Sequence, residues 1–148
     1  MQKKINFKKL FSLCLCILLV AAIAMFTTAC TKNNEGPGTS TSTVDMGVMG
    51  EGEKGFSFFY TDKDGKEYFY GINTDKATVG EALLELGLIA GDEGPYGLYV
   101  KTVGGITLDY DKDGMYWAFY IGSEMAATGV DMTDITAGET YRLVATKG

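Results

Sequence analysis

Hydrophobic and polar positions change character twice along the chain. An apolar run from Leu10 to Phe26 follows a short basic start, and the stretch from Thr31 to about Gly52 then has few large apolar residues. Beyond it, short runs of alternating apolar and polar residues are separated by segments rich in Gly and Asp. Such alternation is typical of β-strands, whose successive side chains point to opposite faces of a sheet. The pattern predicts a leader, a linker and one folded domain, at residues 1–29, 30–53 and 54–148.

The domain begins with two aromatic segments that flank the turn-forming stretch Thr61–Lys66, an arrangement that predicts a β-hairpin. Further segments rich in Tyr, Val and Thr predict additional strands. The expected strands are 56–60, 67–72, 96–103, 106–110, 115–122 and 140–145. We expect the segment Gly91–Pro95 to be a loop.

One helix is predicted between the hairpin and the later strands. Thr78 and Glu81 have the spacing of a capping box, in which a hydroxyl and a carboxylate satisfy backbone N–H groups at the helix start. Apolar residues then recur at helical spacing, and Gly87 is placed to end the helix. The apolar positions are Val79, Ala82, Leu83 and Leu86.

This order of elements predicts an α+β fold. One helix packed on a mixed, mostly antiparallel sheet is a β-grasp-like arrangement. An immunoglobulin-like sandwich is the alternative, and the helix between the hairpin and the later strands argues against it.

The strand around the single tryptophan is apolar on both faces. Alternation assigns one face to Trp117, Phe119 and Ile121, and the other to Tyr116, Ala118 and Tyr120. We expect the tryptophan face to meet the helix. The other face then calls for a cover of its own, which is more sheet, a partner or a ligand.

The leader has the features of an export signal. Lysines precede an apolar run that is short for a transmembrane helix, and the run ends at Phe26-Thr27-Thr28-Ala29-Cys30. This ending resembles the bacterial lipobox, which implies cleavage before Cys30 and lipidation of that cysteine. A plain signal peptide and an uncleaved anchor are the alternatives. The expected location is the cell membrane, lipid-anchored on the extracytoplasmic face.

The segment after Cys30 is rich in Thr, Ser, Gly and Asn and has little to bury, so we expect a flexible tether. Val44, Met46 and Val48 are the only residues that favour the alternative, a first strand of the domain.

Composition excludes several kinds of chemistry. The formal charge of −6 becomes −10 when the four lysines of the leader are removed, which disfavours nucleic acid as a partner. The three cysteines, Cys14, Cys16 and Cys30, all precede the domain, and histidine is absent. Thiol and imidazole catalysis and thiolate or imidazole metal ligation are therefore excluded from the domain. We expect no catalytic residue, no metal site and no required cofactor.

An acidic segment opens like a calcium-binding loop. Asp109, Asp111, Asp113 and Gly114 match the first positions, but Tyr120 stands where a bidentate glutamate is needed. We interpret the segment as a solvated hairpin turn.

All nine tyrosines lie in the domain. Tyrosine suits binding surfaces, because it offers a large amphipathic contact with little rotamer entropy to lose. Sheet-rich domains also use aromatic residues simply to fill half-buried faces. Both interpretations stay open.

Four short motifs in order resemble the bacterial domain allied to the C-terminal β-domain of transcobalamin and intrinsic factor. They are the Thr-Val helix start with Ala-Leu, the Tyr-Gly-x-Tyr-Val strand before a glycine turn, the Tyr-Trp strand, and the Gly-Val-Asp and Gly-x-Thr-Tyr-x-Leu pair. The matching stretches are Thr78–Leu83, Tyr96–Ile106, Tyr116–Tyr120 and Gly129–Leu143.

The resemblance implies a β-grasp domain that contacts a corrinoid, which the vitamin carriers hold between this domain and a helical one. The implied ligand-binding residues here are Tyr96, Tyr99, Thr102, Gly104, Gly105, Tyr116 and Trp117. We expect no helical partner domain in this chain, and it has no histidine to ligate cobalt, so a corrinoid would be held by stacking, apolar contact and hydrogen bonds.

The expected function is therefore an extracytoplasmic binding module that is attached to the membrane by its lipid. It would capture a corrinoid or another small molecule and pass it to a transporter. The alternative is an interaction domain for another cell-envelope protein, without a small-molecule ligand.

Overall fold

The computed structural model describes residues 42–148, which form nine strands, two short helices and one 3₁₀ turn. No helix in this range is long and apolar enough to cross a membrane. The expected signal peptide, Cys30 and the first part of the tether lie outside the described residues.

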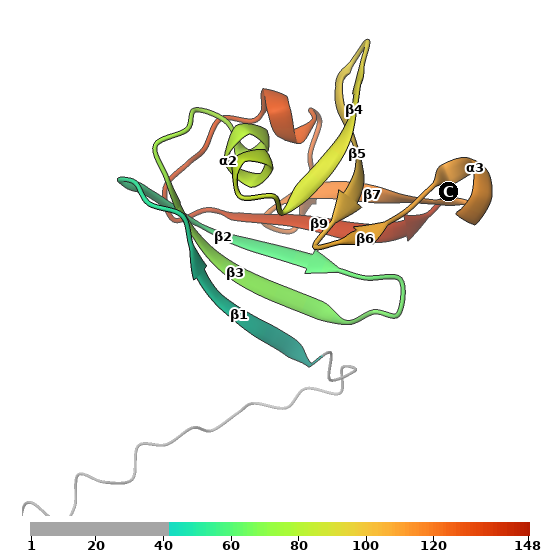
Figure 1. The fold of residues 1–148 in the computed structure, drawn as a ribbon, viewed down its shortest axis with the longest axis horizontal. Helices are drawn as coiled ribbons and strands as arrows, with labels where there is room; N and C mark the ends of the chain where they lie inside the picture. The colour runs from blue at the N-terminus through green and yellow to red at the C-terminus, as the bar shows by residue number, and fades with distance from the viewer. Residues whose placement is uncertain (1–41) are drawn as a thin grey trace, which may run out of the picture. The chain divides into compact units, whose positions relative to one another are not determined.

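Six strands form the larger sheet, in the order β1-β3-β2-β9-β7-β8 (Figure 1). β1 pairs with β3 and β2 with β9 in parallel, and the three remaining neighbour pairs are antiparallel. The strands are β1 (Thr43–Met49), β2 (Lys54–Thr61), β3 (Glu67–Thr74), β7 (Met115–Ile121), β8 (Glu124–Met125) and β9 (Thr140–Lys147). The expected α+β class and the mixed sheet are confirmed.

A second sheet of three antiparallel strands lies on the same side as the first helix (Figure 1). Its strands are β4 (Ile89–Gly94), β5 (Gly97–Val103) and β6 (Ile106–Thr107). The β4–β5 hairpin projects away from the larger sheet. The turn residues Pro95 and Tyr96 lie between the paired ends of the two strands, Gly94 and Gly97.

The predicted helix is α2 (Val79–Glu85). Its capping box is formed as expected, with the Thr78 hydroxyl accepting from the Glu81 N–H and the Glu81 carboxylate accepting from the Thr78 N–H. Gly87 follows with a φ of 66°, which a residue without a Cβ adopts easily. Local sequence chemistry thus determines both ends of this helix.

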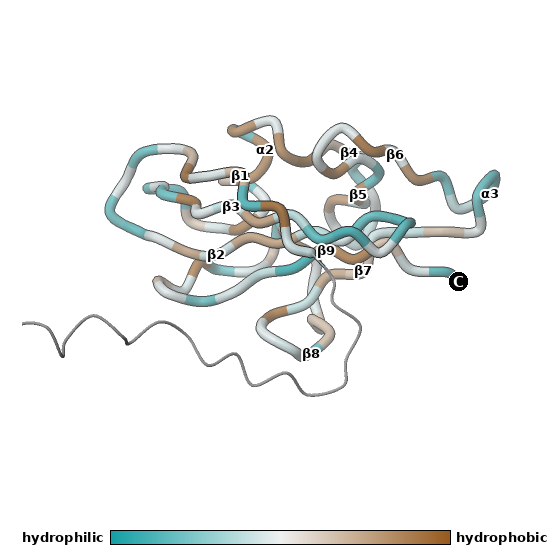
Figure 2. Tube along the Cα trace, turned by 90° about the horizontal axis from the view of Figure 1, so that it is seen from below, coloured by the Kyte–Doolittle hydropathy of each residue, from teal (hydrophilic) through white to brown (hydrophobic). Residues whose placement is uncertain are grey.

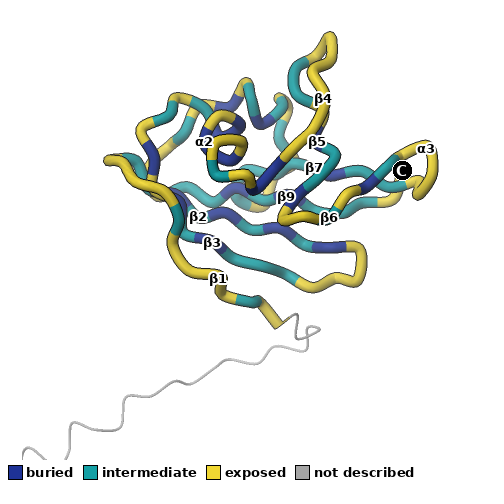
Figure 3. The backbone as a smooth tube through the Cα atoms, in the orientation of Figure 1, coloured by how far each residue is buried: buried dark blue, intermediate teal, exposed yellow. Residues whose placement is uncertain are grey.

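The core lies between the larger sheet and the layer made of α2 and the small sheet. Buried positions alternate along β2 and β3, and the sheet-facing side of α2 is buried (Figure 3). Aromatic rings fill much of this space, including Phe58, Tyr60, Trp117 and Tyr141. Val79, Ala82 and Leu83 close the core from the helix side.

The structure differs from the sequence-based expectations in the segment between residues 43 and 49. We assigned it to the tether, but it forms β1 at the edge of the larger sheet. Met46 and Val48 are exposed, at 48% and 71%. The strand is held by backbone pairing to β3, and this pairing leaves little trace in the hydrophobic pattern.

The segment Gly91–Pro95, expected to be a loop, contributes Gly91–Gly94 to β4. The acidic segment, expected to be a hairpin turn, is a four-residue helix, α3 (Tyr110–Asp113), which ends at Gly114 in the left-handed conformation. Figure 2 shows this segment as hydrophilic. In both cases strand pairing or capping by neighbouring groups, rather than hydrophobic periodicity, determines the local structure.

Candidate ligand-binding site

Trp117 is part of the core. Only 6% of its surface is exposed, and its indole Nε1 donates to the Lys101 carbonyl at 3.1 Å. Its ring meets Tyr60 edge-to-face, with the centroids 6.4 Å apart. The expected orientation toward the core is confirmed, and it makes Trp117 a link between β7 and β5 with no free face for a ligand.

The turn between Thr102 and Gly105 is also committed to internal contacts. The hydroxyls of Thr102 and Thr107 are hydrogen bonded at 2.8 Å, and the Gly104 N–H donates to the Leu88 carbonyl at 2.8 Å. Gly104 has a φ of 56° and lies directly against the Tyr60 ring. The structure therefore brings this turn and Trp117 together, around Tyr60, as packing partners.

Tyr116 lies on the opposite face of β7 and is half-buried. Since alternate residues of a strand point to opposite faces, Tyr116 and Trp117 cannot contribute to one surface. Tyr116 belongs to the face of the larger sheet that α2 does not cover.

Tyr96 and Tyr99 lie at the tip of the β4–β5 hairpin. Tyr96 is 92% exposed and Tyr99 is 44% exposed. With Pro95 and Leu98 they line a hollow of about 310 Å³. Exposed aromatic rings beside a hollow are suited to stacking on a planar ligand. Of the residues that the sequence singled out, these two are the most available.

Asp131 lies against the turn end of this hairpin. Its carboxylate oxygens lie against Gly97, where an added Cβ would come within 2.5 Å of Oδ2 and 2.9 Å of Oδ1. Gly97 also has a φ of 100°. Asp131 Oδ1 is buried and has no hydrogen-bond partner among the described residues. The sequence motif Gly129-Val130-Asp131 pointed to this residue without indicating its contact with the hairpin.

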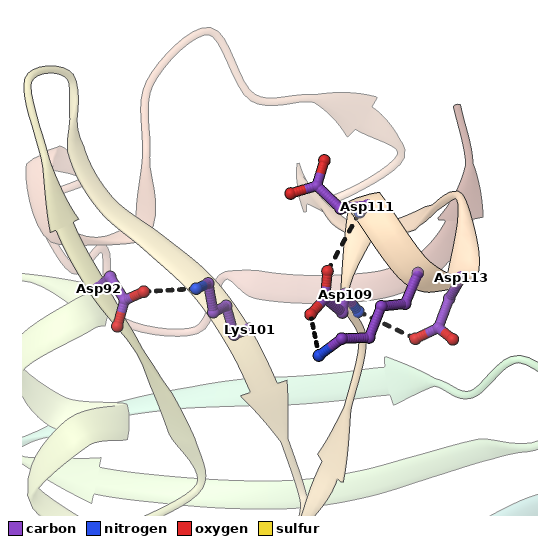
Figure 4. A network of polar contacts seen from close by, with 6 residues as sticks. Asp92, Lys101, Asp109, Asp111 and Asp113 are labelled. Atoms are coloured by element: carbon purple, nitrogen blue, oxygen red, sulfur yellow. Dashed lines mark hydrogen bonds and ion pairs between the residues drawn. The ribbon is translucent and has the colours of Figure 1, made fainter.

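The acidic residues near this region are engaged with lysines and backbone groups (Figure 4). Asp92 pairs with Lys101, and Asp109 pairs with Lys112 at 2.9 Å. The Lys112 ammonium lowers the pKa of Asp109. Asp109 also accepts from the Asp111 N–H, and Asp113 accepts from the Asp109 N–H. These contacts explain the short helix without an ion.

Within residues 42–148, no three side chains of His, Cys, Asp or Glu are grouped so that they could hold a metal ion. The unpartnered oxygen of Asp131 is a single donor facing glycines.

A hollow that the sequence did not single out lies on the uncovered face of the larger sheet. It has a volume of about 510 Å³ and is lined by Tyr120, Gly122, Ser123, Thr140, Arg142 and Val144. Arg142 is the only arginine among thirteen basic residues, so the sequence alone could have singled out this position as unusual.

No family model matches the sequence, and no curated protein matches it significantly. A solved structure from Ruminococcus gnavus ATCC 29149, described as a putative metal binding protein, does match. It is 30% identical, with a TM-score of 0.62, and the match covers 65% of this chain and 99% of that chain. The chain is a relative of this protein.

Haptocorrin, solved in complex with Cbi, shares the fold. It is 16% identical with a TM-score of 0.54, and the match covers 64% of this chain but only 25% of the haptocorrin chain. The expected likeness to the transcobalamin group is thus confirmed at the level of the fold. This chain spans about a quarter of haptocorrin.

The aromatic cluster of Tyr60, Tyr68, Tyr70 and Trp117 leads to a prediction about stability at high pH. Burial, together with the neighbouring phenols of Tyr70 and Tyr68, raises the pKa of Tyr60 from 10.0 to about 12. Because its pKa is higher in the folded than in the unfolded chain, the protonated Tyr60 phenol contributes to the free energy of unfolding. This contribution is complete below pH 10 and is lost as the pH rises from 10 toward 12.

We therefore expect the free energy of unfolding to fall less steeply between pH 10 and pH 12 in Tyr60→Phe than in the native chain. Urea unfolding at a series of pH values measures this difference. Tyr96→Phe is the control, because it removes a phenol that is already exposed in the folded state. Identical slopes for all three chains would contradict the assignment.

Proposed function

We propose that this chain is a lipid-anchored, extracytoplasmic binding module that captures a small planar molecule, such as a corrinoid, at the tip of the β4–β5 hairpin. The observation that carries the proposal is the pair of exposed tyrosines, Tyr96 and Tyr99, beside the hollow of about 310 Å³. Leaving a tyrosine ring 92% exposed forgoes the stabilisation of burial, and a ligand that stacks on it would recover that energy.

The shape of the hairpin supports this role. Backbone pairing between β4 and β5 extends from Ile89–Val103 to Gly94–Gly97, so the tip is held by a ladder rather than by a free loop. Asp131 packs against Gly97, the first residue of β5 after the turn. A preorganised tip loses less entropy when a ligand binds.

The fold of haptocorrin supports a small-molecule ligand by analogy, because that protein was solved with Cbi. We also infer that the larger sheet, with α2 packed across it, is a β-grasp-like arrangement. The lipid anchor rests on the lipobox-like sequence ending at Cys30. Labelling with radioactive palmitate would test the anchor, and incorporation that persists in Cys30→Ser would argue against it.

Titration of the full chain in detergent with cobinamide and with cobalamin tests the binding proposal. Calorimetry and the corrinoid absorption spectrum are the two readouts. We expect saturable binding that weakens by about tenfold or more in Tyr96→Ala and in Tyr99→Ala, because truncating a tyrosine at the centre of a contact costs about 2 kcal/mol.

Tyr110→Ala is the matched control, since Tyr110 is 53% exposed on α3, away from the hairpin. It is expected to bind like the native chain. Absence of any heat or spectral change at high micromolar corrinoid would reject the corrinoid as ligand. Equal weakening in all three variants would reject the hairpin as the site.

A further inference from the structure

The uncovered face of the larger sheet carries a row of large side chains in register across the strands. Phe69 on β3 lies opposite Phe59 on β2, Phe59 lies opposite Arg142 on β9, and Arg142 lies opposite Tyr120 on β7. Paired residues of neighbouring strands point to the same face. All four side chains are partly exposed, so the row is open to solvent.

Arg142 is held in the middle of this row by two contacts. Its guanidinium lies over the Phe59 ring, 4.7 Å from the centroid, and Phe59 packs on Phe69 at 4.9 Å. Its Nη1 donates to Glu67 Oε2 at 3.0 Å. Glu67 is itself oriented by the Thr43 hydroxyl, which donates to its other oxygen at 2.7 Å. The arginine fork is therefore fixed before any ligand arrives.

Most of the donor capacity of this fork is unused. A guanidinium has five N–H donors, and the bond to Glu67 is the one side-chain hydrogen bond that Arg142 makes within residues 42–148. The side chain is 39% exposed and lines the hollow of about 510 Å³. Donors with this arrangement are suited to a second carboxylate.

The lining of the hollow complements an anion with an apolar body. Arg142 supplies its only charge, and Tyr120, Ser123 and Thr140 supply hydroxyls. The Tyr120 ring and Val144 supply the apolar surface. Glu139, just before β9, has its carboxylate engaged with the Thr140 N–H at 2.8 Å.

The identity of the cation strengthens this argument. Lysine provides the positive charge at every other basic position of the chain, and Arg142 is the one exception. Arginine differs from lysine in its planar fork, which stacks on aromatic rings and binds carboxylates through two parallel bonds. Arg142 stacks on the Phe59 ring and pairs with the Glu67 carboxylate, so it uses both of these properties.

From these contacts we propose that the hollow beside Arg142 is a second binding site, which takes a small organic carboxylate with a planar or apolar body. The carboxylate binds the free edge of the guanidinium, and the body packs on Tyr120 and Val144. This site lies on the face of the larger sheet opposite the hairpin and does not depend on the function proposed for the hairpin tip.

Nuclear magnetic resonance titration of the full chain with benzoate tests this site. The chain has one arginine, so a single Nε–H signal reports directly on Arg142. We expect saturable shifts of that signal and of the amides of Tyr120, Ser123 and Thr140. Benzamide, which has the same shape without the charge, is expected to bind at least about tenfold more weakly, since a neutral amide cannot form a charge-assisted pair with the guanidinium.

Variants separate recognition from structural support. Arg142→Gln is expected to weaken benzoate binding about tenfold or more, and Arg142→Lys by a smaller factor, because lysine keeps the charge without the fork. Lys147→Gln removes one positive charge from the same strand, outside the hollow, and is expected to change affinity by less than about twofold. Tyr96→Ala is expected to leave benzoate binding unchanged, which separates this site from the hairpin.

Three results would overturn the proposal: no saturable shift in the native chain at tens of millimolar benzoate, equal affinity for benzoate and benzamide, or equal losses in Arg142→Gln and Lys147→Gln. Should Arg142→Gln fail to fold, the comparison of the two probes on the native chain and on Arg142→Lys decides the question.

Discussion

Trp117→Ala is expected to lower the free energy of unfolding by about 3–5 kcal/mol, the usual cost of removing a buried tryptophan. The substitution empties a core position that is 6% exposed and removes the edge-to-face contact with Tyr60. It also leaves the Lys101 carbonyl without its indole donor. Urea unfolding followed by circular dichroism measures the loss.

Tyr116→Ala is the matched control, one residue away on the same strand and on the opposite face. Because Tyr116 is only half-buried, we expect a loss of about 1 kcal/mol or less. Equal losses for the two variants, or a Trp117→Ala protein as stable as the native chain, would show that Trp117 is not a core residue.

Gly104→Ala is expected to destabilise the domain by about 2–5 kcal/mol. Its φ of 56° costs an alanine about 1–2 kcal/mol, and the new methyl group would overlap the Tyr60 ring. Overpacking of a core typically adds about 1–3 kcal/mol. Because Tyr60 packs on Tyr68 and Trp117, it has little room to move away.

Gly105→Ala separates the two causes. Gly105 also has a positive φ, 81°, but nothing lies within 4 Å of an added Cβ. The free energy of unfolding of Gly105→Ala should therefore fall only by the cost of the positive φ, about 1–2 kcal/mol. If urea unfolding gives equal losses for the two alanines, a methyl group at Gly104 does not overlap the Tyr60 ring, and the close packing of the turn on Tyr60 is wrong.

The sequence predicted those parts of the fold that local chemistry determines. Thr78 and Glu81 specify the start of α2 by hydrogen bonds that span three residues, and they form as expected. The β2–β3 hairpin follows from two aromatic segments and a turn in which Asp62 accepts from the N–H groups of Asp64 and Lys66. Each of these contacts joins residues that are neighbours in the sequence.

Two strands, β1 and β4, were not predicted. β1 exists because its backbone pairs with β3, about 24 residues further along the chain. β4 was missed for a different reason: its partner β5 is its neighbour in the sequence, but Gly91–Gly94 consists of Gly, Asp and Glu, which are poor strand formers. Neither pairing is visible in hydrophobic periodicity.

The candidate site was predicted in part. Alternation along β7 correctly placed Trp117 toward the core and Tyr116 away from it. It could not show that the turn at Gly104 packs against Tyr60, since that contact joins residues 44 positions apart. The row of Phe69, Phe59, Arg142 and Tyr120 was missed because its members come from four strands, and no single segment of sequence contains them.

The two edges of the larger sheet limit how this domain can associate with other proteins. One edge, β1, changes register between Asp45 and Val48, and the other, β8, is only two residues long. A partner that recruits a domain by β-augmentation needs a long regular edge on which to add its own strand. Neither edge offers one, so copies of this domain should resist edge-to-edge aggregation, and a protein partner would have to recognise side chains on a face or at the hairpin tip.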